Sequence, residues 1–217
     1  SGYIVGQLYY SDRGELEQAM RYADSAFASL KDDTAKRAQI RIAYLHNNVG
    51  GDYLKMRDYA QALSHYTQCA KLLERYQPEN LSAAYDGIAM VYEGMLQPKK
   101  AIEYNEKAIA AAEKYGSKNA IAKRQLNYIV KLINMEKFDL AEARLTKIQP
   151  LVKEVNTSFT WFLFYQNKGH LLRHQKEYNA AITSFIKAKD YAQSSDDKYQ
   201  YLSILDPLCK TLMQAGQ

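Results

Sequence analysis

Residues 46–70, HNNVGGDYLKMRDYAQALSHYTQCA, contain the pattern that decides the fold. Ala62 has an aromatic residue three positions before it and another four positions after it, Tyr59 and Tyr66. Spacings of three and four residues place side chains on one face of an α-helix. A small residue on that face lets an antiparallel helix approach closely, while the large ring packs into a neighbouring unit. The stretch therefore predicts a helix, a turn and a second helix packed together.

The same pattern returns along the chain. Alanines in the position of Ala62 also stand at 19, 101, 141 and 181, so that consecutive spacings are 43, 39, 40 and 40 residues. A Tyr or Leu precedes the alanine by nine residues in every copy: Tyr10, Tyr53, Tyr92, Leu132 and Leu172. Such a period is the signature of a repeat protein, in which each unit buries its apolar face against its neighbours.

The composition agrees with helices, because the 217 residues include only 10 Gly and 4 Pro. No apolar run approaches the roughly 18 residues that a membrane-spanning helix requires. The chain starts Ser1-Gly2-Tyr3, with no signal-peptide pattern. We therefore expect a soluble cytoplasmic or periplasmic protein with no targeting or membrane segment in this chain. Its net charge of +5 suits an acidic partner but is too small to favour nucleic acid.

The pattern, clearest over His46–Ala70, resembles the tetratricopeptide repeat (TPR), a helix–turn–helix of 34 residues, here lengthened to about 40. Repeats of this length are typical of kinesin-light-chain-like proteins and of bacterial regulatory TPR domains. The resemblance covers nearly the whole chain. It implies an all-α, right-handed superhelical solenoid of about five TPR-like helix pairs plus a C-terminal helix. We predict one solenoid domain, 1–217, with repeats at 1–32, 33–78, 79–117, 118–156 and 157–196, and a terminal helix at 197–217.

The resemblance also implies that the first helix of each pair lines a concave groove that binds a protein or an extended peptide. Fourteen residues before the alanine, where a side chain should point into this groove, stand Asn48, Asn127 and Asn167, interrupted by Gly87. They resemble the asparagine ladder of kinesin-light-chain-like repeats, whose amides hold the main chain of a peptide. Alternatively, these asparagines bond between neighbouring helices and fix the stacking of repeats. The two roles can coexist.

Neighbouring groove positions should set selectivity. They are mixed in charge and size: Tyr44, Asn47, Asp86, Lys123, Gln166, His170 and Arg173. The residues of the two-carboxylate clamp that binds chaperone C-termini do not occur in any three consecutive repeats, which disfavours that partner. His170 and His174 are four residues apart, as zinc ligands can be, but no third ligand suggests itself. We expect no metal site, and two groove histidines that titrate near the usual pKa of about 6.5.

Catalytic motifs are missing from the sequence. We find no nucleophile with a plausible base, no phosphate-binding Gly-rich loop and no paired carboxylates in a recognisable setting. We therefore predict a peptide- or protein-binding scaffold that is not an enzyme and uses no cofactor. The alternative is a sensory or regulatory domain of a larger bacterial signalling or transcription-regulatory protein. Nucleic-acid binding by the helical surface is a third, disfavoured hypothesis, which predicts affinity that falls steeply with salt.

Overall fold

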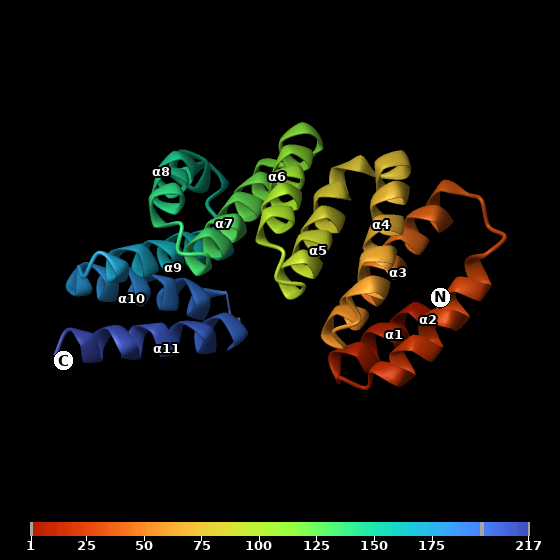
Figure 1. The fold of residues 1–217 in the computed structure, drawn as a ribbon, viewed down its shortest axis with the longest axis horizontal. Helices are drawn as coiled ribbons and strands as arrows, with labels where there is room; N and C mark the ends of the chain where they lie inside the picture. The colour runs from red at the N-terminus through yellow and green to blue at the C-terminus, as the bar shows by residue number, and fades with distance from the viewer. Residues whose placement is uncertain (1, 196–197, 217) are drawn as a thin grey trace. The chain divides into compact units, whose positions relative to one another are not determined.

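The computed structural model describes residues 2–195 and 198–216, and every regular element in these residues is helical (Figure 1). The elements are α1 (Gly2–Asp12), α2 (Leu16–Leu30), α3 (Lys36–Lys55), α4 (Tyr59–Tyr76), the 3₁₀ turn η1 (Pro78–Asn80), α5 (Leu81–Gly94), α6 (Pro98–Tyr115), α7 (Lys118–Asn134), α8 (Phe138–Val155), α9 (Ser158–His174), α10 (Tyr178–Ser194) and α11 (Lys198–Gln214). The all-α prediction is confirmed.

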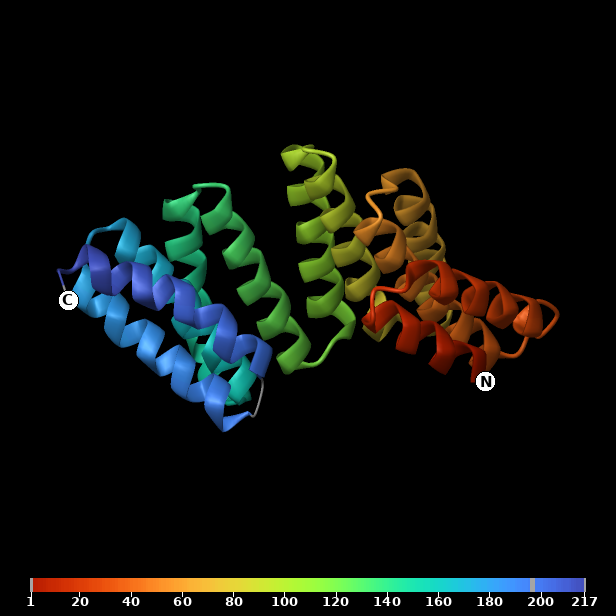
Figure 2. The same ribbon diagram turned by 90° about the horizontal axis from the view of Figure 1, so that it is seen from below.

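Ten of these helices form five hairpins. The members of each hairpin, α1/α2, α3/α4, α5/α6, α7/α8 and α9/α10, pack along one another and are joined by turns at residues 13–15, 56–58, 95–97, 135–137 and 175–177. The last helix, α11, packs against α10 and touches α9; all three lie side by side in Figures 1 and 2. The five helix pairs and the C-terminal helix that the repeat predicts are therefore present.

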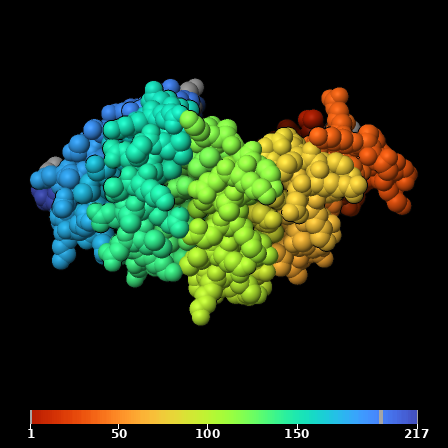
Figure 3. Space-filling model, turned by 90° about the horizontal axis from the view of Figure 1, so that it is seen from above, coloured from red at the N-terminus to blue at the C-terminus, as the bar shows by residue number. Residues whose placement is uncertain are grey.

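The helices group into two compact units, residues 2–116 with α1 to α6, and residues 117–216 with α7 to α11. Each unit is described by itself below. Within a unit, side chains fill the spaces between the ribbons, as the surface of α5 and α6 shows (green, Figure 3). A single solenoid domain with the predicted repeat limits stays a prediction, and its limit at 196/197 lies outside the described residues.

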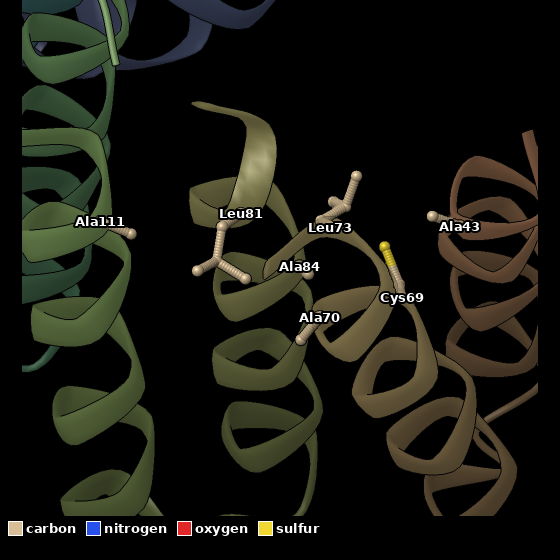
Figure 4. Close-up of a cluster of buried hydrophobic side chains, with 7 residues drawn as sticks. All are labelled: Ala43, Cys69, Ala70, Leu73, Leu81, Ala84 and Ala111. Atoms are coloured by element: carbon tan, nitrogen blue, oxygen red, sulfur yellow. The ribbon is translucent and has the colours of Figure 1, made fainter. Parts of the chain in front are cut away.

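Small buried residues explain the close packing of the hairpins. The five repeat alanines, Ala19, Ala62, Ala101, Ala141 and Ala181, have no exposed surface at all. In unit 1 the small side chains continue into a buried cluster formed by Ala43, Cys69, Ala70, Leu73, Leu81, Ala84 and Ala111 (Figure 4). The second helix of a pair thus presents small residues wherever another helix comes close.

All five hairpins close with the same turn. The residue five positions before each alanine has a positive φ: Gly14 (76°), Arg57 (60°), Leu96 (56°), Glu136 (58°) and Lys176 (65°). The next residue donates its N–H to the carbonyl of Tyr10, Tyr53, Tyr92, Leu132 or Leu172, each time over 2.9 Å. This is the Schellman motif, in which a left-handed residue ends the helix and satisfies a free carbonyl. The recurring Tyr or Leu, nine residues before each alanine, is therefore the residue that accepts the closing bond.

Four of these left-handed positions carry a side chain, which gives a stability prediction. Leu96, with φ 56° and 87% exposed, is the best case. A left-handed L-residue costs about 1–2 kcal/mol, and the flexibility of glycine offsets about 0.5–1 kcal/mol of the gain from relieving it. Leu96→Gly should therefore raise the free energy of unfolding by about 0.5–1 kcal/mol in urea denaturation. Met95→Gly is the control: Met95 has an ordinary φ of −79°, so this change should destabilise. If Leu96→Gly also destabilises, the left-handed conformation does not strain Leu96.

Glycines make room for the large rings inside a unit. Tyr66 of α4 lies against Gly50 of α3, where an added Cβ would come within 3.2 Å of the ring. The same pair recurs in unit 2, where Phe185 of α10 lies against Gly169 of α9. Both glycines stand twelve residues before their repeat alanine and both rings four residues after it. The repeat therefore specifies where one helix is hollowed and which ring fills the hollow.

Candidate functional site

The predicted groove residues all lie on the first helices of their pairs. Unit 1 carries Tyr44, Asn47 and Asn48 on α3 and Asp86 on α5; unit 2 carries Lys123 and Asn127 on α7, and Gln166, Asn167, His170 and Arg173 on α9. The structure thus describes two sets of candidate residues, one in each unit.

Asn48 lies at the edge of a buried polar network between α1 and α3. Its Nδ2 donates to Oε1 of Gln7 over 3.3 Å, and Gln7 in turn donates to Oδ2 of Asp52 over 2.7 Å. The other Asp52 oxygen accepts from the Ser11 hydroxyl and lies 3.4 Å from Nζ of Lys55. Asp52 is only 1% exposed. The Asn48 amide nitrogen therefore bonds between helices, as the alternative hypothesis expects.

The other two ladder asparagines differ from each other. Asn167 is fully buried and donates from Nδ2 to the main-chain carbonyl of Leu126 on α7 over 3.0 Å. Its Oδ1 is buried without a partner among the described residues. Asn127 is half-buried on α7. Asn48 and Asn167 thus both bond to a neighbouring first helix, and contact of the ladder with a peptide stays a prediction.

The interruption of the ladder at Gly87 has a steric cause. A Cβ at this position of α5 would overlap the ring of Tyr66, which reaches across from the preceding helix pair. Tyr66 is 5% exposed, so its ring has little freedom to move away. An asparagine cannot replace Gly87 while Tyr66 fills this space.

The remaining candidates of unit 1 and of α7 have contacts of several kinds. The Tyr44 hydroxyl bonds Gln77 Oε1 over 2.9 Å and accepts from Asn80 Nδ2 over 2.7 Å, which ties α3 to the end of the hairpin that follows. Nζ of Lys123 lies 5.0 Å from the centre of the Phe159 ring, a cation–π distance. Asn47, Asp86 and Gln166 are half-buried.

A cavity of about 740 Å³ in unit 2 lies among the first helices α7, α9 and α11. Its lining joins charged, polar and apolar side chains: Ile133, Asn134, Glu136, Phe138, His170, Arg173, His174, Lys210, Met213 and Gln214. Two of the predicted groove residues, His170 and Arg173, are in this lining. The cavity has the size and mixed lining of a ligand pocket.

His170 and Arg173 contact each other at this cavity. Nη2 of Arg173 lies 3.4 Å from Nδ1 of His170, and its guanidinium pairs with no carboxylate in the part of the chain that the structure describes. Burial, helped by the Arg173 charge, lowers the pKa of His170 to about 4. The ring is therefore neutral at pH 7, and its Nδ1 can accept a hydrogen bond from Arg173. The expectation that His170 titrates near pH 6.5 is wrong, because the ring packs edge-on against Phe185 with the ring centres 5.1 Å apart.

The second histidine of the pair, His174, stacks on Phe138 with ring centres 3.5 Å apart and an angle of 12° between planes. Together they form a flat wall of the cavity. Within residues 2–195 and 198–216, no group of three or more His, Cys, Asp or Glu is placed to hold a metal ion.

Sequence reasoning missed the part of the cavity that α11 and the end of α7 supply. A signal for it existed in the repeat period. Ile133, Arg173 and Met213 are 40 residues apart, and so are Asn134, His174 and Gln214. Equivalent positions of three consecutive first helices therefore meet around one cavity, and the neighbours of Arg173 could have been found by counting 40 residues in each direction.

Unit 1 contains another close pair of histidines, at the contact of α3 and α4. Nδ1 of His46 lies 3.0 Å from Nδ1 of His65, and the Phe27 ring lies 4.7 Å from that of His46. Burial, and the nearby His65, lower the pKa of His46 to about 4. Burial also lowers the pKa of His65, against the attraction of Asp24. Both rings are therefore held neutral in the folded protein.

These buried histidines predict acid-sensitive folding. The unfolded chain binds protons at His46 and His170 below about pH 6.5, whereas the folded chain does so only near pH 4. Their contribution is therefore complete above pH 6.5 and is lost as the pH falls from 6.5 toward 4. Allowing for solvent screening of partly exposed rings, the free energy of unfolding should be about 2 kcal/mol lower at pH 5 than at pH 7.5.

Urea denaturation at both pH values measures this difference. His46→Gln should reduce it, whereas His174→Gln, at an exposed position, should leave it unchanged. Equal stability of the wild type at pH 7.5 and pH 5 would contradict the prediction.

Comparison with known proteins agrees with this architecture. Family models described as tetratricopeptide repeat match residues 41–114 and 163–195. The fold is similar to BtubC (BKLC) from P. vanneervenii, with a TM-score of 0.73 and 17% identity over 93% of this chain and 83% of that one. It is similar to a Rap protein complexed with Competence and Sporulation Factor, with a TM-score of 0.74 and 14% identity over 97% of this chain and 62% of that one. No curated protein sequence matches the chain significantly.

A third structure with this fold is a putative kinesin light chain from Podosopora anserina with nearly identical TPR-like repeats, at a TM-score of 0.57 and 11% identity over 99% of this chain and 95% of that one. At such identities the likeness concerns the fold. Together with the family models, it makes the chain a TPR-like protein, as the repeat predicts.

The TPR-like fold is that of a scaffold for protein binding, and families of such scaffolds are generally not enzymes. None of the described helices is both long and apolar enough to span a membrane.

Proposed function

We propose that the chain is a peptide- or protein-binding scaffold whose first helices form the binding face. The observation that carries this proposal is the cavity of about 740 Å³ among α7, α9 and α11. All of its lining comes from first helices, except Glu136 and Phe138 at the turn and start of α8. Its few polar groups converge beside apolar walls, which is the arrangement that gives a binding pocket both affinity and orientation.

An extended peptide suits this face better than a compact small molecule. Half-buried polar side chains continue from the cavity along α7 and α9, including Lys123, Asn127 and Gln166. Amide side chains offer both a donor and an acceptor, so they bind main chain of any sequence. The cavity would then hold one or two side chains of a peptide whose backbone lies along the two helices.

Photo-crosslinking tests where a peptide binds. A random peptide library is selected on the whole chain, and the enriched peptides are resynthesised with a benzophenone group at each end. Mass spectrometry then identifies the linked residues. Crosslinks should fall on first helices such as α7, α9 and α11, and should be rare on α8 and α10. Crosslinks that concentrate on the second helices, or a selection that enriches nothing, would refute the proposed binding face.

A second candidate is a sensory domain of a larger regulator. It is supported by the fold likeness to the Rap protein that was solved with Competence and Sporulation Factor, of which this chain spans 62%. A sensory domain must change conformation when its ligand binds. Small-angle scattering of the chain with and without an enriched peptide distinguishes the two candidates. A changed radius of gyration favours the sensory domain, and an unchanged one favours the scaffold.

A further inference from the structure

We propose that the cavity among α7, α9 and α11 binds a carboxylate of the peptide on Arg173, with His170 as the positioning residue. The inference rests on the proposed function and names the chemistry of its ligand. The carboxylate belongs to an acidic side chain or to the C-terminus, next to an apolar residue that enters the same cavity. The proposal follows from the charges, the hydrogen bonds and the apolar wall of the lining.

Arg173 is the cation that is available in this cavity. The other strong cation of the lining, Lys210, already pairs with Asp206 over 2.8 Å. Glu136 is the acidic residue of the lining, and it forms no ion pair with Arg173 in the described parts of the chain. A guanidinium that is half-buried without an anion gains most from a ligand that brings one.

His170 leaves the guanidinium open to such a ligand. Its neutral Nδ1 takes one of the five N–H groups of Arg173, at 3.4 Å, and four remain as donors. Two N–H groups in parallel match the two oxygens of a carboxylate. The His170 ring is itself held by Phe185, which packs into the hollow left by Gly169. Phe185, His170 and Arg173 therefore form a supported series of contacts that aims the guanidinium.

The opposite part of the lining is apolar. Phe138 stacked on His174 supplies a flat surface, and Ile133 and Met213 are on equivalent turns of α7 and α11. Burying an aliphatic or aromatic side chain there contributes affinity, while the carboxylate fixes the register of the peptide. The expected ligand is thus a peptide in which an acidic group stands beside an apolar residue.

The test uses the whole chain and a peptide that library selection has enriched. This peptide is synthesised in three forms: unchanged, with an amidated C-terminus, and with Asp and Glu replaced by Asn and Gln. Fluorescence anisotropy at pH 7.5 gives the Kd of each form for wild type, Arg173→Met, Arg173→Lys and Lys153→Met. Lys153 is an exposed residue of α8 outside the cavity and serves as the matched control.

Arg173→Met should weaken binding of the unchanged peptide by about 10- to 100-fold, the usual range for a charge-assisted hydrogen bond. Lys153→Met should have no effect, and Arg173→Lys should lie between them. Removing the carboxylate from the peptide should weaken wild-type binding by a similar factor and should not weaken Arg173→Met further. The amidated and Asn/Gln forms identify whether the C-terminus or a side chain supplies the carboxylate.

The positioning role of His170 has its own readout, the ratio of affinities for the acidic and the neutral peptide. His170→Leu should lower this ratio while leaving the affinity for the neutral form unchanged. His170→Gln, which keeps an acceptor, should restore part of it. A purely structural role would weaken both peptides equally, which would overturn this part of the proposal.

Two results would overturn the carboxylate site. If enriched peptides bind wild type and Arg173→Met equally, or lose nothing when their carboxylates are removed, the carboxylate site is wrong while the binding scaffold stands. If no peptide binds at all, the proposed function fails together with it. The peptide substitutions need no protein variant, so the answer does not depend on whether Arg173→Met folds.

Discussion

Replacing Asp52 with alanine should lower the free energy of unfolding of unit 1 by about 3–5 kcal/mol, the usual loss when one partner is removed from a buried charged network. Asp52 is 1% exposed and accepts hydrogen bonds from Gln7 and Ser11, which are buried as well. Without the carboxylate, the Gln7 amide and the Ser11 hydroxyl keep the cost of their burial and lose their partner. Lys55, which is half-exposed, can turn to water and adds little to the loss.

Hydrogen exchange shows whether this effect is local. Amides of α1 and α3 should lose protection in Asp52→Ala, whereas those of α9 and α10 in unit 2 should keep theirs. Asp12→Ala, which removes an exposed carboxylate of α1, is the control and should change stability by less than about 0.5 kcal/mol. If Asp52→Ala costs under about 1 kcal/mol, the network does not hold α1 to α3.

Adding one methyl group at Gly87 should cost about 3 kcal/mol, the upper end of the usual range for overpacking a core. The new Cβ would overlap the Tyr66 ring, which Gly50 confines from the other side. A double-mutant cycle isolates this clash. In a Tyr66→Leu background, Gly87→Ala should cost less than about 1 kcal/mol, a coupling of about 2 kcal/mol between the two sites.

A neighbouring glycine of the same contact is the matched control. A Cβ at Gly51 of α3 would meet only the Tyr66 hydroxyl at 3.5 Å, an ordinary contact. Gly51→Ala should therefore raise stability by up to about 1 kcal/mol, because alanine favours a helix more than glycine does. Equal losses for Gly87→Ala and Gly51→Ala in urea denaturation would mean that helix geometry, and not the Tyr66 ring, decides both.

The fold could be predicted because the repeat records it several times. A buried alanine, a ring four residues later and a closing carbonyl nine residues earlier each follow from close helix contacts that every hairpin needs. The left-handed residue of each turn was not predicted. Arg57, Leu96, Glu136 and Lys176 occupy a conformation that favours glycine, so their identities give no sign of it.

The candidate site was harder to predict, because a groove residue and a stacking residue differ by a small rotation of the helix. Asn167 is fully buried, yet Lys168, one residue further on, is exposed. A helix turns about 100° per residue, so spacing alone does not decide which side of the boundary Asn167 occupies. His170 shows the same limit: its lowered pKa depends on contact with Phe185, fifteen residues away in the sequence.

The polar network of unit 1 acquires a second meaning when its residues are compared with the cavity of unit 2. Ser11 and Ile133 each stand eight residues before a repeat alanine, and Lys55 and His174 each stand seven before one. In unit 1 these positions bond to each other, with Nζ of Lys55 2.9 Å from Oγ of Ser11. In unit 2 they line an open pocket. One half of the protein thus occupies this corner of the repeat with its own side chains, as a built-in substitute for a guest, while the other half leaves it open. Duplicated repeats can divide labour in this way, since one copy maintains the architecture and the other is free to diverge as a receptor.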